Sequence, residues 1–231
     1  YQIWQSGFGF AMLGMGGQLS FMCPDKDFIF VCNADMQCSV GGYGDKIANI
    51  VKYLFYDNLS DTPLKENKAA YSLLSDKLSR LELVNGYGKA TSPIVEKING
   101  ATYICDNNPA NITDFTLNFN GDEGEFDFTK DGVKKTIKFG MEKYVKAPFP
   151  ETKYYGMKIG FPAERELSAL TSASFISDKF LLIRVYIADV CFGHLGITIE
   201  FNGKDAAIVK MVKNAEHFFY DYKGLFAAKR R

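Results

Sequence analysis

The chain has 231 residues, of which 47% are hydrophobic and 23% charged, the composition of a globular protein rather than a disordered one. Its 27 lysine and arginine residues balance 27 aspartate and glutamate residues, which argues against a general nucleic-acid or anionic-membrane binder, since these carry a basic excess. The longest apolar runs are a few residues, so no segment of roughly 20 residues crosses a bilayer as a helix.

Short strands joined by turns are predicted at the start of the chain. Residues 1–5, 8–13, 18–23 and 28–33 have strand character and are separated by turn-forming residues. Connections this short make neighbouring strands antiparallel. The chain begins within a strand, which favours a fragment of a longer protein.

Two amphipathic helices are predicted next. Asp45 is suited to cap the first, which ends near Asn58. Its apolar residues recur at helical spacing: Ile47, Ile50, Val51, Leu54 and Phe55. The second follows Pro63 and carries a similar stripe: Ala70, Leu73, Leu74, Leu78 and Leu81.

From about Ile94 the apolar pattern changes to a period of two, which predicts strands. Four dipeptides supply the positive φ that tight hairpins need: Asn99-Gly100, Asn120-Gly121, Asp131-Gly132 and Asn202-Gly203. Eight or so strands linked in this way predict an antiparallel barrel or sandwich. The expected fold class is therefore α+β, an antiparallel sheet piece with two helices followed by an antiparallel β-barrel, with the boundary near residue 90.

The cysteines and histidines give no metal site. The five cysteines contain no Cys-x-x-Cys pair, and His194 and His217 are the only histidines. An odd number of thiols favours free cysteines in a reducing compartment, hence the cytoplasm. Cys23 and Cys32 are the pair to examine, because they are expected on neighbouring strands. No cofactor is predicted.

Three other groups of residues have structural interpretations. The acidic residues at 122–127 are expected to form a solvated hairpin, with Lys134, Lys135 and Lys138 facing it. His194 is expected to be structural. The aromatic residues at 218–222 either line a pocket or, more often in proteins, close the end of a barrel core.

The glycine cluster Gly14-Met15-Gly16-Gly17-Gln18 is the most informative local feature. Glycines where one strand turns into the next allow another backbone or a ligand to approach closely. No Gly-Lys-Ser/Thr follows, and the βαβ setting of a dinucleotide fingerprint is missing, so neither nucleotide-binding motif is present. A tight turn or bulge is the plain structural interpretation.

With the strand Tyr1–Trp4 before it and the stretch Phe21–Val31 after it, this cluster resembles the carboxyl end of serine hydrolases related to class C β-lactamases and penicillin-binding proteins. The resemblance covers residues 1–58 and places Met15-Gly16-Gly17 at the family's third active-site motif. It implies that the backbone N–H of Gln18 is an oxyanion-hole donor.

The departures from this family limit what the chain does alone. Met15 stands where the family has a lysine or histidine, and no Ser-x-x-Lys nucleophile motif occurs. Tyr56-Asp57-Asn58 matches the second motif in letters but lies at the end of the closing helix, so we interpret it as chance. The resemblance implies a bacterial serine hydrolase of which this chain is a non-catalytic part, its partner being an amino-terminal hydrolase region of the same polypeptide.

Residues 91–231 resemble the lipocalin-like β-barrel domains that follow such hydrolase domains, through Ile98–Tyr103, Asn107-Asn108-Pro109 and Phe201–Asp205. Residues 59–90 then form a linker helix. Two alternatives for the barrel stay open: a module that binds a small ligand or peptide, or a purely structural domain. The first piece exposes apolar faces, which predicts packing on the barrel or a homodimer.

Overall fold

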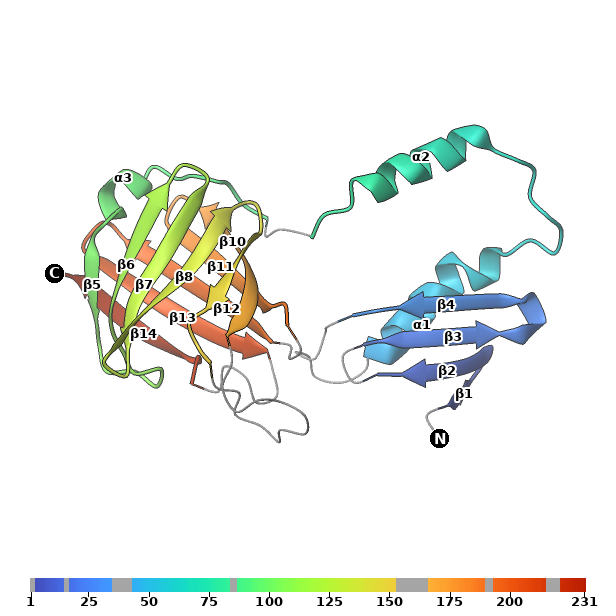
Figure 1. Ribbon diagram of the computed structural model, residues 1–231, viewed down its shortest axis with the longest axis horizontal. Coiled ribbons are helices and arrows are strands. Elements are labelled where there is room, and N and C mark those ends of the chain that lie inside the picture. Colours follow the sequence, from blue (N-terminus) through green and yellow to red (C-terminus); the bar gives the residue numbers. More distant parts are fainter. Residues whose placement is uncertain are drawn as a thin grey trace. The chain divides into compact units, whose positions relative to one another are not determined.

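The computed structural model describes residues 3–14, 17–34, 43–83, 87–152, 166–189, 193–214 and 221–231 (Figure 1). The chain divides into two units, Tyr1–Glu82 and Leu83–Arg231. The division lies before residue 90 because Lys89 already pairs with the second unit: its N–H and carbonyl exchange hydrogen bonds of 2.9 Å with Phe175.

The first unit holds a four-stranded sheet in chain order, with every neighbouring pair antiparallel. Its strands are β1 (Trp4–Ser6), β2 (Gly9–Leu13), β3 (Leu19–Cys23) and β4 (Phe28–Cys32). A 3-10 turn, η1 (Pro24–Lys26), joins the last two. The helical elements follow: α1 (Tyr43–Leu54), η2 (Tyr56–Asn58) and α2 (Lys68–Ser79).

Two details of the helices differ from the sequence-based expectation. The first helix begins at Tyr43, so Asp45 lies inside the first turn and is not its cap. The second is capped by Asn67, whose side chain accepts a hydrogen bond of 3.0 Å from the N–H of Ala70.

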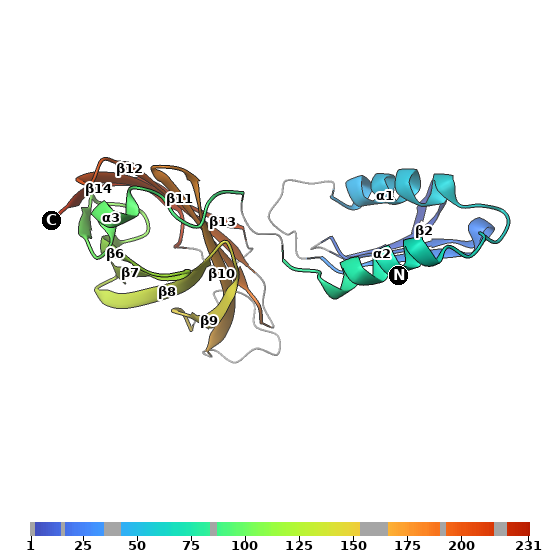
Figure 2. The same cartoon turned by 90° about the horizontal axis from the view of Figure 1, so that it is seen from above.

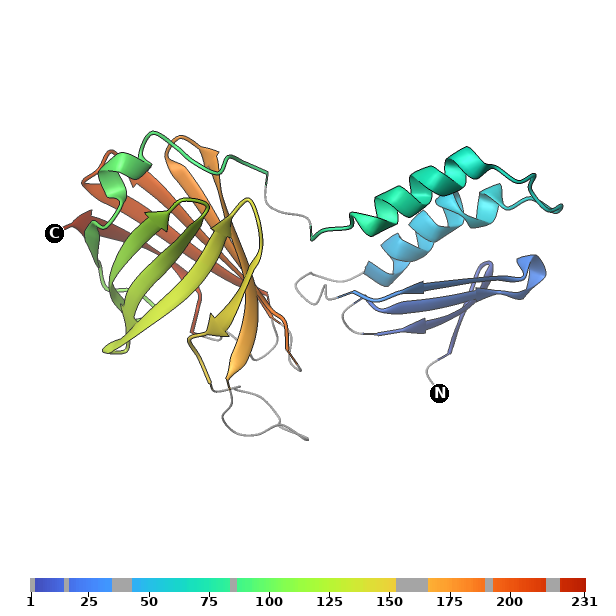
Figure 3. The same cartoon turned by 45° about the horizontal axis from the view of Figure 1, so that its top comes forward.

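One face of this sheet is buried and the other is not. Figure 3 shows α1 along one face, where Phe21 and Cys23 are buried and Ile47 of α1 packs against them. The side chains that alternate with these face away from α1 and are exposed: Phe10, Met12, Ile29 and Val31. An exposed apolar face of this kind is consistent with the expectation that another surface covers it. Packing on the barrel or on a second copy of the chain stays a prediction.

The second unit is a closed barrel of nine described strands (Figure 2). A short helix, α3 (Val95–Ile98), precedes it. Around the barrel the strands follow the order β5 (Thr102–Cys105), β6 (Ile112–Asn120), β7 (Glu123–Lys130), β8 (Val133–Met141), β10 (Leu167–Ser177), β11 (Phe180–Ile187), β12 (His194–Asn202), β13 (Ala206–Asn214) and β14 (Gly224–Arg230), which pairs with β5.

One pair departs from the predicted antiparallel pattern. β9 (Val145–Phe149) pairs only with the first half of β10, outside the ring of nine. The chain reverses direction from β8 to β9 and again from β9 to β10. The exceptional pair is therefore β8 and β10, which run parallel, with Ser172 opposite Gly140.

Aromatic side chains fill the interior of the barrel. The period-two pattern directs one face of each strand inward, and several of these side chains are at most 1% exposed: Tyr103, Phe115, Phe126, Phe139, Phe175 and Phe201. Tyr103 stacks on Phe115 with ring centroids 5.1 Å apart. Each buried phenylalanine contributes about 1.5–3 kcal/mol to folding. Gly124 is required by this packing, because a Cβ there would lie 2.5 Å from the Phe139 ring.

One end of the barrel is closed by its own elements. α3 lies at this end of the barrel (Figure 1), and its Ile98 is fully buried in the core. The hydroxyl of Tyr103 donates a hydrogen bond of 2.8 Å to the carbonyl of Lys204 in the β12–β13 turn. In the described part of the chain, no helix has the length and apolar character needed to span a membrane.

Candidate functional site

Backbone hydrogen bonds between its described residues close a turn at the glycine cluster of the first unit. Its Met15 and Gly16 lie outside the described residues. The N–H of Gly14 donates 2.8 Å to the carbonyl of Gln18, and the N–H of Gly17 donates 3.2 Å to the carbonyl of Gly14. Gly17 has φ +83°, and the Gln18 side chain lies where a Cβ on Gly14 would stand. The close approach that requires glycine is therefore made by the chain's own Gln18.

A shallow recess of about 240 Å³ adjoins this turn. It is lined by Met12, Leu13, Gly14, Gln18, Leu19, Ser20, Val31, Cys32 and Asn33. Gln18 lies at its edge and donates a hydrogen bond from its side-chain amide to the carbonyl of Ala34. Among the described residues that line the recess there is no nucleophile–base pair. The role of the Gln18 N–H as an oxyanion donor stays a prediction.

The described cysteines are free thiols. Cys23 and Cys32 lie on neighbouring strands, as expected, but at positions far apart along those strands. Cys23 lies opposite Phe28, and Cys32 opposite Leu19, at the two ends of the β3–β4 pair. A disulfide between them is excluded by this register. Burial raises the pKa of Cys105 to about 12. Three further candidates lie outside the described residues: Cys38, Cys191 and His217. The described residues contain no cluster of metal-ligating side chains.

The acidic hairpin and His194 both contact neighbouring side chains. Lys138 pairs with Glu125 across β7 and β8 at 3.4 Å, as predicted, whereas Lys135 turns away to another carboxylate. Asp127 accepts a hydrogen bond of 2.5 Å from the hydroxyl of Thr136. The ring of His194 packs edge-on against Tyr186, with centroids 4.3 Å apart.

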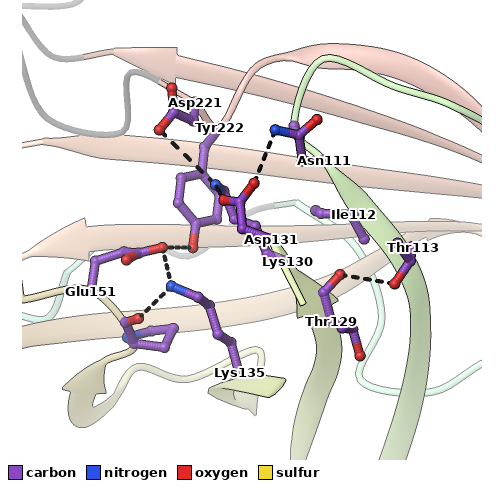
Figure 4. A network of polar contacts seen from close by, with 12 residues as sticks. Asn111, Ile112, Thr113, Thr129, Lys130, Asp131, Lys135, Glu151, Asp221 and Tyr222 are labelled. Carbon is purple, nitrogen blue, oxygen red and sulfur yellow. Dashed lines mark hydrogen bonds and ion pairs between the residues drawn. The ribbon is translucent and has the colours of Figure 1, made fainter. Parts of the chain in front are cut away.

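At the second end of the barrel, which we call the mouth, several of the described residues are charged. The pairing of the strands brings together the ends of β7, β9 and β13 and the starts of β8 and β14. Six residues from these segments form the mouth cluster: Lys130, Asp131, Lys135, Glu151, Asp221 and Tyr222 (Figure 4).

The lysines of the mouth occupy positions that point into the barrel. Lys130 continues the inward alternation of Phe126 and Phe128 along β7, and its side chain is 4% exposed. Lys135 has the inward parity of Ile137 on β8. Lys213 lies opposite the buried Leu195, and burial lowers its pKa, with the charge of Lys223 adding to the effect.

The partners of Lys130 lie at the rim. Its Nζ is 2.5 Å from Asp131 and 4.0 Å from Asp221, and it stands 5.5 Å from the centre of the Tyr222 ring. The two carboxylates are about half exposed, 53% and 47%. The hydrogen bond from Lys130 is the largest effect that holds the pKa of Asp131 below its usual value. A buried cation is thus balanced by carboxylates that reach water.

Glu151, just beyond β9, binds the other lysine. Its Oε1 accepts hydrogen bonds from Tyr222 Oη at 2.6 Å and from Lys135 Nζ at 2.5 Å (Figure 4). Burial is the main cause that raises the pKa of Tyr222, and the charge of Glu151 adds to it, so the phenol is a neutral donor. The Tyr222 ring packs on Phe128 and Phe149 with centroids 6.3 and 5.8 Å away.

Two recesses of this unit are lined by described residues. One of about 520 Å³ lies at the mouth end and is lined by Ile104, Cys105, Asp106, Asn107, Asn108, Asn111, Ile112, Thr113, Asp131 and Gly132. It shares Asp131 with the mouth cluster. Another of about 530 Å³ lies on the outer wall over β5–β8, and its lining includes Lys134, Lys135 and Arg231. The carboxylates of Asp114 and Asp127 in this wall accept hydrogen bonds from neighbouring neutral side chains. The described lining of the first recess holds no lysine or arginine, and its link to the buried Lys130 is Asp131, which lies 2.5 Å from Lys130 Nζ.

Sequence reasoning did not single out Lys130 or Glu151. The alternation Phe126, Phe128, Lys130 carried a signal for the first, because the same parity points inward. Glu151 had none, since its partners are fixed by strand pairing. Tyr222 closes the core at this end, the commoner of the two roles considered for the aromatic run; Phe218, Phe219 and Tyr220 lie outside the described residues.

No family model matches the chain, and no curated protein matches it, so neither comparison supports the hydrolase resemblance. Solved structures that resemble its barrel include the fatty-acid-binding protein of Manduca sexta (11% identity, TM-score 0.33, 58% of this chain and 98% of that one). Others are lipid binding protein 8 of Caenorhabditis elegans (8%, 0.37, 58% and 94%) and the brain fatty-acid-binding protein of Drosophila melanogaster (10%, 0.35, 58% and 99%). TM-scores this low carry no functional argument.

Proposed function

We propose that the barrel unit is a small-ligand binding module that holds an amphiphilic anion at its mouth. The observation that carries this proposal is the placement of Lys130 and Lys135 on inward-facing strand positions at one end. Cations are rarely placed on the inner face of a barrel, because burying them without compensation is costly. Here the carboxylates paired with Lys130 and Lys135 are partly exposed and can rotate into the solvent. An anion that enters the mouth then meets the positive charge of the lysines.

The size of the ligand follows from the packing. Because aromatic side chains fill the described interior, a long chain has no room beneath Phe128 and Phe149. The recess of about 520 Å³ at the mouth end adjoins the mouth cluster through Asp131, and its volume is within the range of small-ligand sites. Its exposed Ile104 offers apolar surface. The ligand is therefore short, with one anionic group and a small apolar part.

Calorimetric titration of the full chain with hexanoate, hexyl sulfate and hexanol tests the proposal. Both anions bind saturably, and hexanol binds at least tenfold more weakly, since a hydrogen bond to a charged group contributes about 1.5–3 kcal/mol. Lys130→Met weakens both anions. The matched control is Lys179→Met, which removes a lysine from an exposed pair with Glu200. Equal binding of hexanol, or equal effects of the two variants, contradicts the proposal.

We also propose a second role, for the first unit, as the carboxyl-terminal sheet of a β-lactamase-like serine hydrolase. The favouring observation is the tight glycine turn at the start of β3, with Gln18 at the edge of the recess of about 240 Å³. A fluorophosphonate probe should leave this chain unlabelled, because it has no Ser-x-x-Lys. The native polypeptide, analysed by intact mass and peptide sequencing, should contain that motif; a native chain without it refutes this role.

A further inference from the structure

The carboxylate of Glu151 lies in a site that two other elements build. Tyr222, just before β14, and Lys135 of β8 both donate to the same oxygen, Oε1 (Figure 4). Within the described residues, Oε2 accepts no hydrogen bond. A phenol and an ammonium group directed at one point form a receptor that matches carboxylates in general, because charge-assisted hydrogen bonds are short and strong.

The two donors are more deeply buried than the carboxylate that they hold. Tyr222 is 2% exposed and its ring is held against Phe128 and Phe149. Lys135 is fixed in β8 and also donates 3.2 Å to the carbonyl of Pro150. Glu151 lies two residues beyond the end of β9, with its side chain 27% exposed. We therefore expect the packed donors to keep their positions when this carboxylate moves into water, because a preformed site binds with a smaller loss of entropy.

We propose that Tyr222 and Lys135 form the binding site for the carboxylate group of a ligand, and that Glu151 occupies this site in the unliganded chain and is exchanged for the ligand. This inference rests on the proposed function of the barrel. At the receptor one carboxylate replaces another, so Tyr222 and Lys135 keep a negatively charged acceptor, while the displaced Glu151 carries its own charge into water. The displaced Glu151 gains water in place of its two donors, which keeps the cost of exchange small.

The structure makes Glu151 an internal competitor, so its removal raises the affinity for a carboxylate. Calorimetric titration with hexanoate compares the wild-type chain with Glu151→Ala, which we expect to bind at least tenfold more tightly. Glu200→Ala is the matched control, because it also removes a glutamate from a lysine pair. Its affinity for hexanoate equals that of the wild type. Adding Tyr222→Phe to Glu151→Ala abolishes the gain.

The outcomes separate this inference from the function on which it depends. If the wild type binds hexanoate and Glu151→Ala binds it no more tightly, the exchange is refuted and the binding module stands. If neither chain binds hexanoate or hexyl sulfate, both proposals are refuted. Glu151→Gln keeps the size of the side chain and removes its charge, and should also bind hexanoate more tightly than the wild type. Circular dichroism and melting temperature establish that each variant is folded.

Discussion

The variant Lys130→Met tests whether Lys130 contributes to ligand binding or to the stability of the fold. The wild-type ammonium group is buried, 2.5 Å from Asp131 and 4.0 Å from Asp221. Methionine has nearly the same length and places an apolar group against the Tyr222 ring. The two carboxylates that lose their partner are about half exposed, and Asp131 keeps a hydrogen bond of 2.9 Å from Asn111.

The magnitude follows from where the surviving charges lie. Removing one partner of a buried pair costs about 3–5 kcal/mol when the other charge stays buried. Here the other charges reach water, so the loss is that of an exposed pair, about 0–1 kcal/mol. The desolvation penalty of the ammonium group disappears at the same time. We therefore expect the free energy of unfolding to rise by between about 0 and 2 kcal/mol, while hexanoate binding weakens at least tenfold.

Urea unfolding at neutral pH measures the change in stability, with Lys179→Met as the exposed control. For a unit of this size, a gain of about 1 kcal/mol raises the melting temperature by about 2–4 °C. A destabilisation of about 3 kcal/mol or more would mean that Lys130 is a structural cation, and the argument that it is kept for a ligand would fail.

Three further predictions test the packing and the charges. Gly124→Ala should destabilise the chain by about 1–3 kcal/mol in urea unfolding, because its Cβ would overlap the Phe139 ring; an unchanged midpoint contradicts the packing. Cys105, with its pKa raised to about 12, should resist iodoacetamide at pH 8 until the chain unfolds, as mass spectrometry of labelled peptides will show. The lowered pKa of Asp131 stabilises the fold above the usual value of 3.8 and this contribution is lost as pH falls through the folded pKa, so stability between about pH 5 and 2 should fall more steeply in the wild type than in Lys130→Met.

The barrel could be predicted because its signals are local. Alternation of apolar side chains marked the strands, and the glycines of the Asn-Gly and Asp-Gly turns have the positive φ that the hairpins require: Gly100, Gly121, Gly132 and Gly203. The element order of the first unit followed from its turns and from the spacing of Ile47 and Val51 in α1. Local chemistry placed these elements, since each depends on neighbours in sequence.

The mouth could not be predicted, because it depends on pairing between distant strands. The position of β9 outside the ring, and with it the parallel β8–β10 pair, has no local signal. That pairing brings Glu151 to Lys135 and Tyr222, which are 16 and 71 residues away in sequence. Register decides which carboxylate meets which lysine, so the acidic hairpin near Lys135 in sequence was the wrong partner for it.

The central claim is that the mouth binds a small anion, and its most direct test is a titration of the isotopically labelled full chain with hexanoate, followed by amide chemical shifts. The account predicts saturable shifts at Lys130, Lys135 and Tyr222, and none at Ile98 and Tyr103 near the closed end. Shifts that do not saturate, or that are confined to the closed end or the outer wall over β5–β8, would contradict it.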